Sequence, residues 1–341
     1  MPRPYILSVL DQSPIPDGKT AADALANTLD LARLCDGLGY HRYWLAEHHA
    51  SPGLAGAAPE ALIGPVALRT RHIRIGSGGI MLPHYSPFKI AETFRLLAAL
   101  APGRIDLGIG RAPGTDGRTA FALQRDRSRV MPNDFPQQLA ELLAYLSDSL
   151  PEDHAFASLT RTLPSGGEGS PAPWLLGSSM DSAVWAAETG LPYCFADFIN
   201  SDGAMMAQVY RSRFQPSAWL VEPYMAVAVW AIAAPSQEEA AALAAPAAMM
   251  FHHLHQGELI PVPSVEKALA WRRDTPRAVT RRRRQALGTP AQVRAELDAA
   301  AALYDADEVL LVNIMHDHDT RRRSYALMAE EYGLARRDQA A

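Results

Sequence analysis

This chain of 341 residues is poor in cysteine and has no long hydrophobic run near its start. Its two cysteines, Cys35 and Cys194, lie far apart in apolar stretches, which excludes a disulfide framework and is typical of reduced core residues. The first apolar segment, residues 5–10, stops at Asp11 and is too short for a signal peptide or a membrane span. We therefore expect a cytoplasmic protein without membrane contact.

Positive charge is also in short supply. The 32 Lys and Arg residues are outnumbered by 37 Asp and Glu residues, which gives a formal net charge of −5. The one dense basic run, Arg281–Arg284, fits a solvated helix face better than a nucleic-acid interface, because nucleic-acid binders usually present a broad basic surface. The composition, 48% hydrophobic and 20% charged, predicts a globular protein with no nucleic-acid partner.

Strands and helices alternate along the whole sequence. Eight short β-prone segments are each followed by a segment in which apolar residues recur at helical spacing. The predicted strands cover residues 5–10, 41–46, 73–80, 104–109, 174–176, 192–196, 224–233 and 308–313. Because no change in composition marks a linker, we expect one domain over residues 1–341, an α/β fold of the (β/α)8 TIM-barrel type.

A doubly wound dinucleotide-binding fold is the weaker alternative. Its G-x-G-x-x-G fingerprint should follow an early strand, and the nearest match, residues 108–114, lacks that spacing and carries a proline where a helix would begin. The chain exceeds the roughly 250 residues typical of a barrel, so we expect long insertions at the C-terminal face, at residues 114–173 and 250–287. Three histidines in the second, irregular insertion are expected in a solvated loop: His252, His253 and His255.

Hydroxyl and basic residues stand at the ends of the predicted strands, where barrel enzymes carry their catalytic residues. After the fifth strand, a helix opens with Gly177, Ser178, Ser179 and Ser182. Its free N–H groups and hydroxyls can bind an anion, although Ser178 or Ser179 could serve simply as the N-cap. Arg111 follows the neighbouring fourth strand, and its guanidinium matches a phosphate. Together these residues favour a phosphorylated cofactor.

Two further candidates lie at the same rim. Gly78 and Gly79 end the third strand, where the missing Cβ lets the backbone approach a flat ligand, although bulges and turns use glycine as well. Glu47, His48 and His49 follow the second strand, but adjacent histidines on a strand face opposite sides, so we expect no metal. A single histidine with a pKa of about 6.5 suits acid–base work, and His48 is the candidate.

Four segments together resemble the luciferase-like monooxygenases, the flavin-dependent superfamily of bacterial luciferase. They occur in the family's order, with similar spacing, and the resemblance covers nearly the whole chain. The segments are 43–49 (YWLAEHH), 75–87 (IGSGGIMLPHYSP), 103–111 (GRIDLGIGR) and 176–179 (LGSS). Four linked motifs are far more specific than any one of them.

The resemblance implies a (β/α)8 barrel that binds reduced FMN, usually delivered by a separate flavin reductase, and a homodimer. In the family, O2 adds to flavin C4a, and the resulting peroxyflavin oxygenates a small organic substrate. The residues that match functional positions of the family are Arg111, Ser178, Ser179 and Ser182 for the phosphate, Gly78–Gly79 for a cis peptide behind the isoalloxazine, His48 for the active-site histidine and Phe198 for an aromatic position near the ring.

One departure and two alternatives accompany this prediction. Bacterial luciferase carries a cysteine beside the arginine of the fourth strand, and Gly110 stands here instead, so light emission from a long-chain aldehyde is not expected. Related barrels bind the deazaflavin F420 for hydride transfer, and some luciferase relatives bind flavin without catalysis. Retention of His48 argues against a non-catalytic protein. The leading prediction is therefore an FMN-dependent monooxygenase, with F420-dependent hydride transfer as its closest rival.

Overall fold

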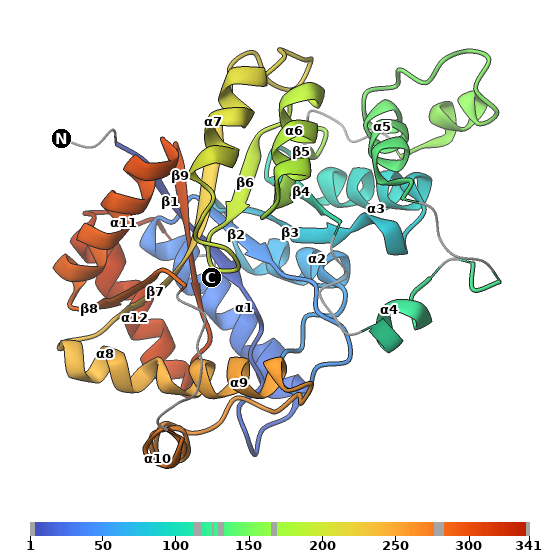
Figure 1. Ribbon diagram of the computed structural model, residues 1–341. Helices are drawn as coiled ribbons and strands as arrows, with labels where there is room; N and C mark the ends of the chain where they lie inside the picture. Colours follow the sequence, from blue (N-terminus) through green and yellow to red (C-terminus); the bar gives the residue numbers. More distant parts are fainter. Residues whose placement is uncertain are drawn as a thin grey trace.

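Eight parallel strands form a closed barrel in the computed structural model of the chain (Figure 1). The structure describes residues 4–111, 117–124, 126–128, 133–164, 169–275 and 283–338. The barrel strands are β1 (Ile6–Asp11), β2 (Arg42–Leu45), β3 (Arg74–Met81), β4 (Ile105–Gly110), β5 (Ala172–Gly177), β6 (Tyr193–Ala196), β7 (Met225–Ala233) and β9 (Glu308–Asn313). Because β6 also pairs with β7, the sheet closes, and the predicted (β/α)8 TIM barrel is confirmed.

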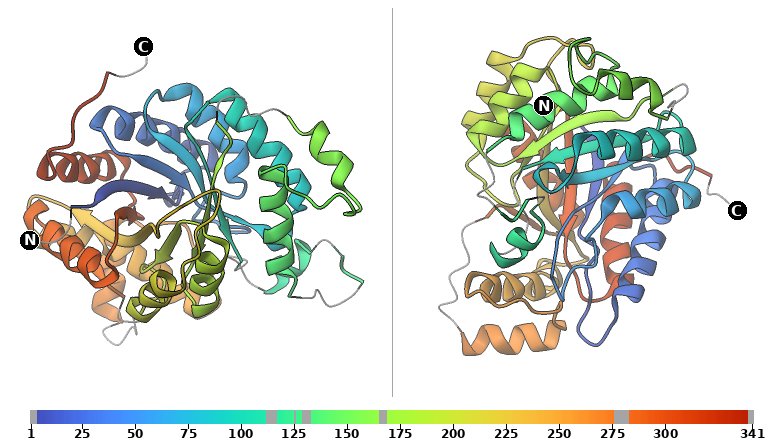
Figure 2. Two further views of the ribbon diagram at one scale, coloured as in Figure 1. Left: turned by 90° about the horizontal axis from the view of Figure 1, so that it is seen from above. Right: turned by 90° about the vertical axis from the view of Figure 1, so that its right-hand side faces the viewer.

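One main helix follows each barrel strand, and Figure 2 shows from above that the helices lie outside the strands. They are α1 (Ala21–Leu38), α2 (Pro59–Arg69), α3 (Pro87–Leu100), α5 (Phe135–Leu146), α6 (Met180–Thr189), α7 (Ala204–Arg213), α11 (Pro290–Tyr304) and α12 (His318–Glu331). Local sequence sets the ends of several of them. Thr20 and Thr289 form capping boxes at the starts of α1 and α11, and Gly39 ends α1 with a φ of 91°.

The described part of the second insertion contains two helices and a strand, although the sequence predicts an irregular segment. It contains the end of α9 (Ala245–His255), then α10 (Val265–Asp274), and finally β8 (Gln285–Gly288), which pairs with β7 outside the closed barrel. The loop predicted for His252, His253 and His255 is therefore wrong, because all three lie on α9. The rings of His252 and His253 pack against Trp271 of α10, so a contact between distant segments orders this region.

The prediction of a solvated helix face at Arg281–Arg284 is also wrong for the residues that the structure describes. Arg281 and Arg282 lie outside the described residues, and the two residues after them precede β8 without helical structure. The Arg284 Nε lies 3.3 Å from a carboxylate oxygen of Asp197, a fully buried residue. The Arg283 guanidinium lies 4.7 Å from the centroid of the Phe251 ring. Arg284 is thus paired with a buried carboxylate, and Arg283 packs against an aromatic ring.

The second insertion covers the C-terminal end of the barrel, as the sequence predicts. The Val262 N–H donates to the carbonyl of Ile15, in the loop after β1, at 2.9 Å. On the other side, the Phe251 ring of α9 packs edge-on against Trp230 of β7. In Figure 1, α9 and α10 accordingly form the lower edge of the molecule. The remaining short elements are α4 (Gly117–Ala122), α8 (Gln237–Leu243), η1 (Leu82–His84) and η2 (Ala157–Thr162).

A buried polar network fills the N-terminal end of the barrel. The Arg42 guanidinium donates to Glu308 at 3.0 Å and to Asp106 at 2.8 Å. Arg74 adds two hydrogen bonds to Asp106, and Tyr224 donates to Glu308 at 2.9 Å. Burial alone would raise the pKa of Asp106, but the two arginines lower it below its ordinary value. We call this group of five side chains the basal network.

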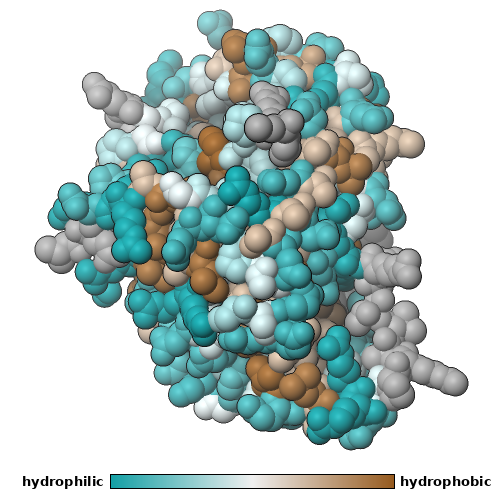
Figure 3. Space-filling model, turned by 90° about the vertical axis from the view of Figure 1, so that its left-hand side faces the viewer, coloured by the Kyte–Doolittle hydropathy of each residue, from teal (hydrophilic) through white to brown (hydrophobic). Residues whose placement is uncertain are grey.

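Among the described residues, no helix is long and apolar enough to cross a membrane. On the described part of the face in Figure 3, hydrophobic side chains form small separate areas within a mostly hydrophilic surface. That face therefore offers no broad apolar patch.

Candidate functional site

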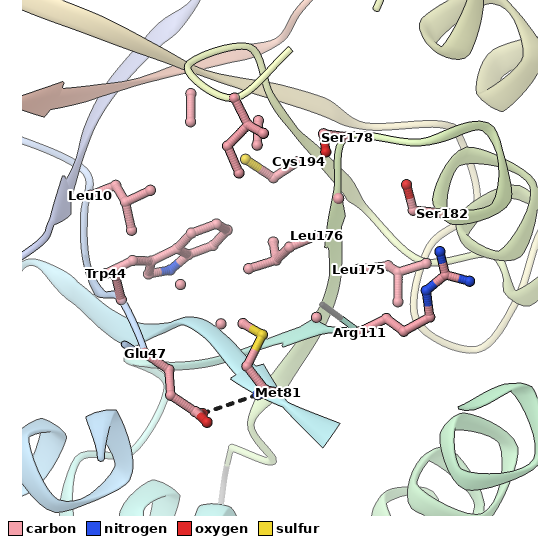
Figure 4. A pocket seen from close by; sticks show the side chains of 18 of the residues that line it. Leu10, Trp44, Glu47, Met81, Arg111, Leu175, Leu176, Ser178, Ser182 and Cys194 are labelled. Carbon is pink, nitrogen blue, oxygen red and sulfur yellow. Dashed lines mark hydrogen bonds between the residues drawn. The ribbon is translucent and has the colours of Figure 1, made fainter. Parts of the chain in front are cut away.

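A cavity opens at the C-terminal ends of the barrel strands, at the end opposite the basal network (Figure 4). Its walls come from residues on β1 to β7 and on several of the segments that follow these strands. All nine site residues predicted from the sequence line it: His48, Gly78, Gly79, Arg111, Gly177, Ser178, Ser179, Ser182 and Phe198. They meet because parallel barrel strands all end on one face.

Arg111 lies on one side of the cavity, against the start of α6. Its Nη1 lies 3.1 Å from an Asp181 carboxylate oxygen in the first turn of that helix. The guanidinium also lies 5.0 Å from the ring centroid of Trp185 on the same helix. Because the Arg111 side chain is 37% exposed, it can bind an anion in the cavity and keep its contact with the helix.

The three serines beside Arg111 have different local roles. Ser179 is the N-cap of α6, and its hydroxyl accepts from the Ser182 N–H in a capping box. The Ser182 hydroxyl donates to the Ser179 carbonyl at 2.7 Å and lies 2.9 Å from the Tyr193 hydroxyl. Gly177 leaves room for it, since a Cβ there would lie 2.3 Å from the Ser182 Oγ. Ser178 precedes the helix and lines the cavity (Figure 4).

The peptide bond between Gly78 and Gly79 is cis, as the family resemblance implies. Both glycines are packed tightly against the walls of the cavity. A Cβ on Gly78 would lie 2.4 Å from Leu10 Cδ1, and one on Gly79 would lie 2.8 Å from Leu176 Cδ1. Glycine is thus required here by close packing within the barrel as well as by any approach of a ligand.

His48 reaches the cavity just after β2. Its backbone N–H donates to the Gly56 carbonyl at 2.7 Å, which fixes the loop, while its buried Nδ1 has no hydrogen-bond partner. Burial, with a smaller contribution from the charge of His49, lowers the pKa of His48 to about 4. The imidazole is therefore neutral at pH 7 and can donate or accept a hydrogen bond toward a ligand.

Glu47 and His49 form a separate pair behind His48. The His49 Nε2 lies 2.7 Å from one Glu47 carboxylate oxygen, and the Met81 N–H donates to the other at 3.0 Å (Figure 4). Burial raises the pKa of Glu47, and these hydrogen bonds oppose that rise. His49 is thus paired with Glu47, whereas the His48 Nδ1 has no partner, and both histidines follow β2 rather than lying on it. Among the described residues, no three or more His, Cys, Asp or Glu side chains could hold a metal.

Sequence reasoning missed the residues that form the deeper walls of the cavity. Leu10, Trp44 and Leu176 give it an apolar floor, visible in Figure 4. Gln12 also lines it and is only 4% exposed, yet its amide nitrogen has no hydrogen-bond partner. A signal for Gln12 did exist, because it lies two positions after Leu10 and so shares a face with it at the end of β1.

The family is settled by comparison of the whole chain with known proteins. The family model described as luciferase-like monooxygenase matches residues 6–307. The chain therefore belongs to the luciferase-like monooxygenase family, which confirms the resemblance inferred from the four motifs.

Individual relatives match over nearly their full length. An Escherichia coli protein named luciferase-like monooxygenase is 43% identical over 324 residues, covering 94% of this chain and 95% of its own. The N-acetyl-S-alkylcysteine monooxygenase of Bacillus subtilis is 37% identical over 336 residues, covering 97% and 99%. The crystal structure of apo-MsnO8 is 37% identical, with a TM-score of 0.88 over 98% of this chain and 99% of that chain.

Proposed function

We propose that the chain is a flavin-dependent monooxygenase that uses reduced FMN and O2 to oxygenate a small organic substrate. The observation that carries the proposal is a single cavity with an arginine and a helix N-terminus on one side and a neutral, unpartnered histidine on the other. Two of its relatives, at 43% and 37% identity, carry the word monooxygenase in their names. The same proposal includes a separate reductase, a homodimer and a cytoplasmic location.

The residues of the cavity fit FMN. Arg111 supplies a planar cation for the phosphate, and the N-terminus of α6 supplies free N–H groups and a favourable dipole. Ser178 would add a hydroxyl, whereas Ser179 and Ser182 would act mainly by fixing the helix start. The apolar floor and the lack of side chains at Gly78–Gly79 suit an aromatic ring system.

The remaining residues would serve the chemistry. Bound reduced flavin supplies the electrons that activate O2. His48, neutral at pH 7, would hold or move a proton beside the reacting atoms, because an imidazole with a free nitrogen can do either. Trp44, Leu176 and Phe198 would exclude water from that region, since they line the cavity with apolar surface.

Formation of an oxygenated product tests this function against F420-dependent hydride transfer. The protein is incubated with chemically reduced FMN, O2 and a panel of small thioethers and ketones. The panel includes N-acetyl-S-alkylcysteines, because one relative is named for them. We expect a panel compound to be oxygenated only when all components are present. Anaerobic turnover with F420, with no FMN-dependent product, would overturn the proposal, and tight flavin binding without any turnover would favour the non-catalytic alternative.

A further inference from the structure

Gln12 is buried at the cavity wall, and one polar atom of its side chain lacks a hydrogen-bond partner. The residue is 4% exposed, and its amide nitrogen has no hydrogen-bond partner. Burying such a group unpaired is unfavourable, so it calls for an explanation. Among the cavity-lining residues that the structure describes, only Gln12 and His48 carry a buried side-chain atom of this kind.

The side chains on either side of Gln12 in sequence have hydrogen-bond partners. The lack of a partner is therefore particular to Gln12 and not a general feature of the loop. The Asp11 carboxylate accepts from Arg321 at 2.6 Å and from Tyr43 at 2.5 Å. The Ser13 hydroxyl accepts from Thr28 at 2.9 Å. These side chains face the surrounding helices, whereas Gln12 shares the inner face of the strand with Leu10.

The position of Gln12 relative to the phosphate side follows from the strand order. Around the closed barrel, three strands separate β1 from β5 in either direction, so Gln12 and Ser178 follow strands on opposite sides of the mouth. Figure 4 agrees, because Leu10 and Glu47 lie across the cavity from Arg111 and Ser182. A phosphorylated ligand held at α6 would therefore extend toward Gln12 and His48.

We infer that the Gln12 carboxamide donates a hydrogen bond to a carbonyl oxygen of the ligand, beside His48 and across the cavity from the phosphate. A carboxamide N–H pairs well with a neutral carbonyl, and the apolar surroundings of Leu10 and Trp44 strengthen such a bond. The carbonyl belongs either to the flavin ring or to the organic substrate. The inference rests on the proposed function for the identity of the ligand. Gln12 would then help to determine which ligand the cavity binds.

Two substitutions of matched length test the donor. Gln12→Glu removes the donor at neutral pH and keeps the shape, and Gln12→Met removes all hydrogen bonding. Gln208→Glu makes the same chemical change at an exposed position of α7 and is the control. Circular dichroism and thermal melting of each apo protein report on folding. We expect Gln12→Met to melt no lower than the wild type, because it removes an unpaired buried group.

Fluorescence titration with FMN and with riboflavin, which lacks the phosphate, distinguishes the two sources of the carbonyl. If the carbonyl is on the flavin ring, both Gln12 variants weaken both ligands roughly tenfold, whereas Arg111→Ala weakens FMN alone. If the carbonyl is on the substrate, both flavins bind normally, and the KM of the turned-over panel compound rises roughly tenfold with a smaller change in kcat.

The inference is overturned if both flavin affinities and the KM stay within twofold of the wild type, or if only the charged variant differs. It is also overturned if Gln12→Met melts well below the wild type with unchanged affinities, since that outcome assigns Gln12 a structural role. A wild-type protein that binds no flavin would instead contradict the proposed function. The two failures are therefore distinguishable.

Discussion

Inside the barrel, the buried polar groups at the two ends differ in whether they have hydrogen-bond partners. At the N-terminal end, the Arg42 guanidinium is bonded to two carboxylates, and Asp106 accepts hydrogen bonds from Arg42, Arg74 and Trp44. At the C-terminal end, Gln12 and His48 each bury a nitrogen without a partner. The same eight strands thus carry an ion-paired base and, at the other end, a cavity wall with two unpaired nitrogens, although Asp11 outside that wall is paired with Arg321.

This difference separates stability from function within one fold. Polar groups that bind each other hold the closed end together, whereas polar groups left unpaired can bind a ligand. Substitutions at the base should therefore change the free energy of unfolding, and substitutions at the mouth should change binding or turnover. Four measurements on variants test that division.

Arg42→Ala should destabilise the fold most. It leaves the buried carboxylates of Asp106 and Glu308 without their shared cation, and breaking a buried ion pair costs about 3–5 kcal/mol. Urea denaturation measures this loss. The control, Arg213→Ala, removes an exposed pair with Glu188 and should cost less than about 1 kcal/mol. Equal losses for the two variants would mean that the base does not depend on its ion pairs.

His48→Ala should leave the fold and flavin binding nearly intact while lowering product formation about a hundredfold or more, because a positioned acid–base group contributes on that scale. Single-turnover product assays with reduced FMN measure the effect. His72→Ala, at an exposed histidine before β3, is the control. Full product yield from His48→Ala would remove this residue from the chemistry.

Arg111→Ala should weaken FMN binding by roughly ten- to a hundredfold, since a hydrogen bond to a charged group is worth about 1.5–3 kcal/mol. The free energy of unfolding should barely change, because the Arg111 and Asp181 side chains are both partly exposed. Arg111→Lys should bind with intermediate affinity, as it keeps the charge but loses the planar fork. An unchanged dissociation constant in a fluorescence titration would refute the phosphate assignment.

The low pKa of His48, about 4, predicts a pH effect on stability. In the unfolded chain the group titrates near its ordinary value of about 6.5, so between these values the unfolded state binds more protons. Stability should therefore fall as the pH falls from about 6.5 toward 4. His48→Gln cannot titrate and should lack that component in urea denaturation at pH 7, 5.5 and 4.5. Parallel pH profiles for the two proteins would contradict the burial of a neutral imidazole.

The barrel could be predicted from the sequence because each of its eight units contains a strong local pattern. A short apolar strand, a capping residue such as Thr20 and a helix with apolar spacing recur along the chain. The second insertion lacked such a pattern. The strand β8 has four residues and depends on pairing with β7. Ser264 caps α10 locally, but that helix also packs on α9 through Trp271, so tertiary contacts help to specify both elements.

The site was predictable for a related reason, and within limits. Residues at the C-terminal ends of parallel strands must converge, so His48, Arg111 and Ser178 reach one cavity even though they are distant in sequence. The pairing of Arg111 with Asp181 was not predictable, because it depends on side-chain geometry. Gln12 was passed over because its segment, Asp11 to Pro14, is typical of a turn.

The most direct test of the proposed function follows the oxygen atom. The wild-type protein is given reduced FMN, a panel compound and ¹⁸O2, and the product is analysed by mass spectrometry. A monooxygenase site at the mouth of this barrel predicts one ¹⁸O atom in each product molecule, and no product without reduced FMN. Product that forms without the label, or only anaerobically with reduced or oxidised F420, would contradict the account.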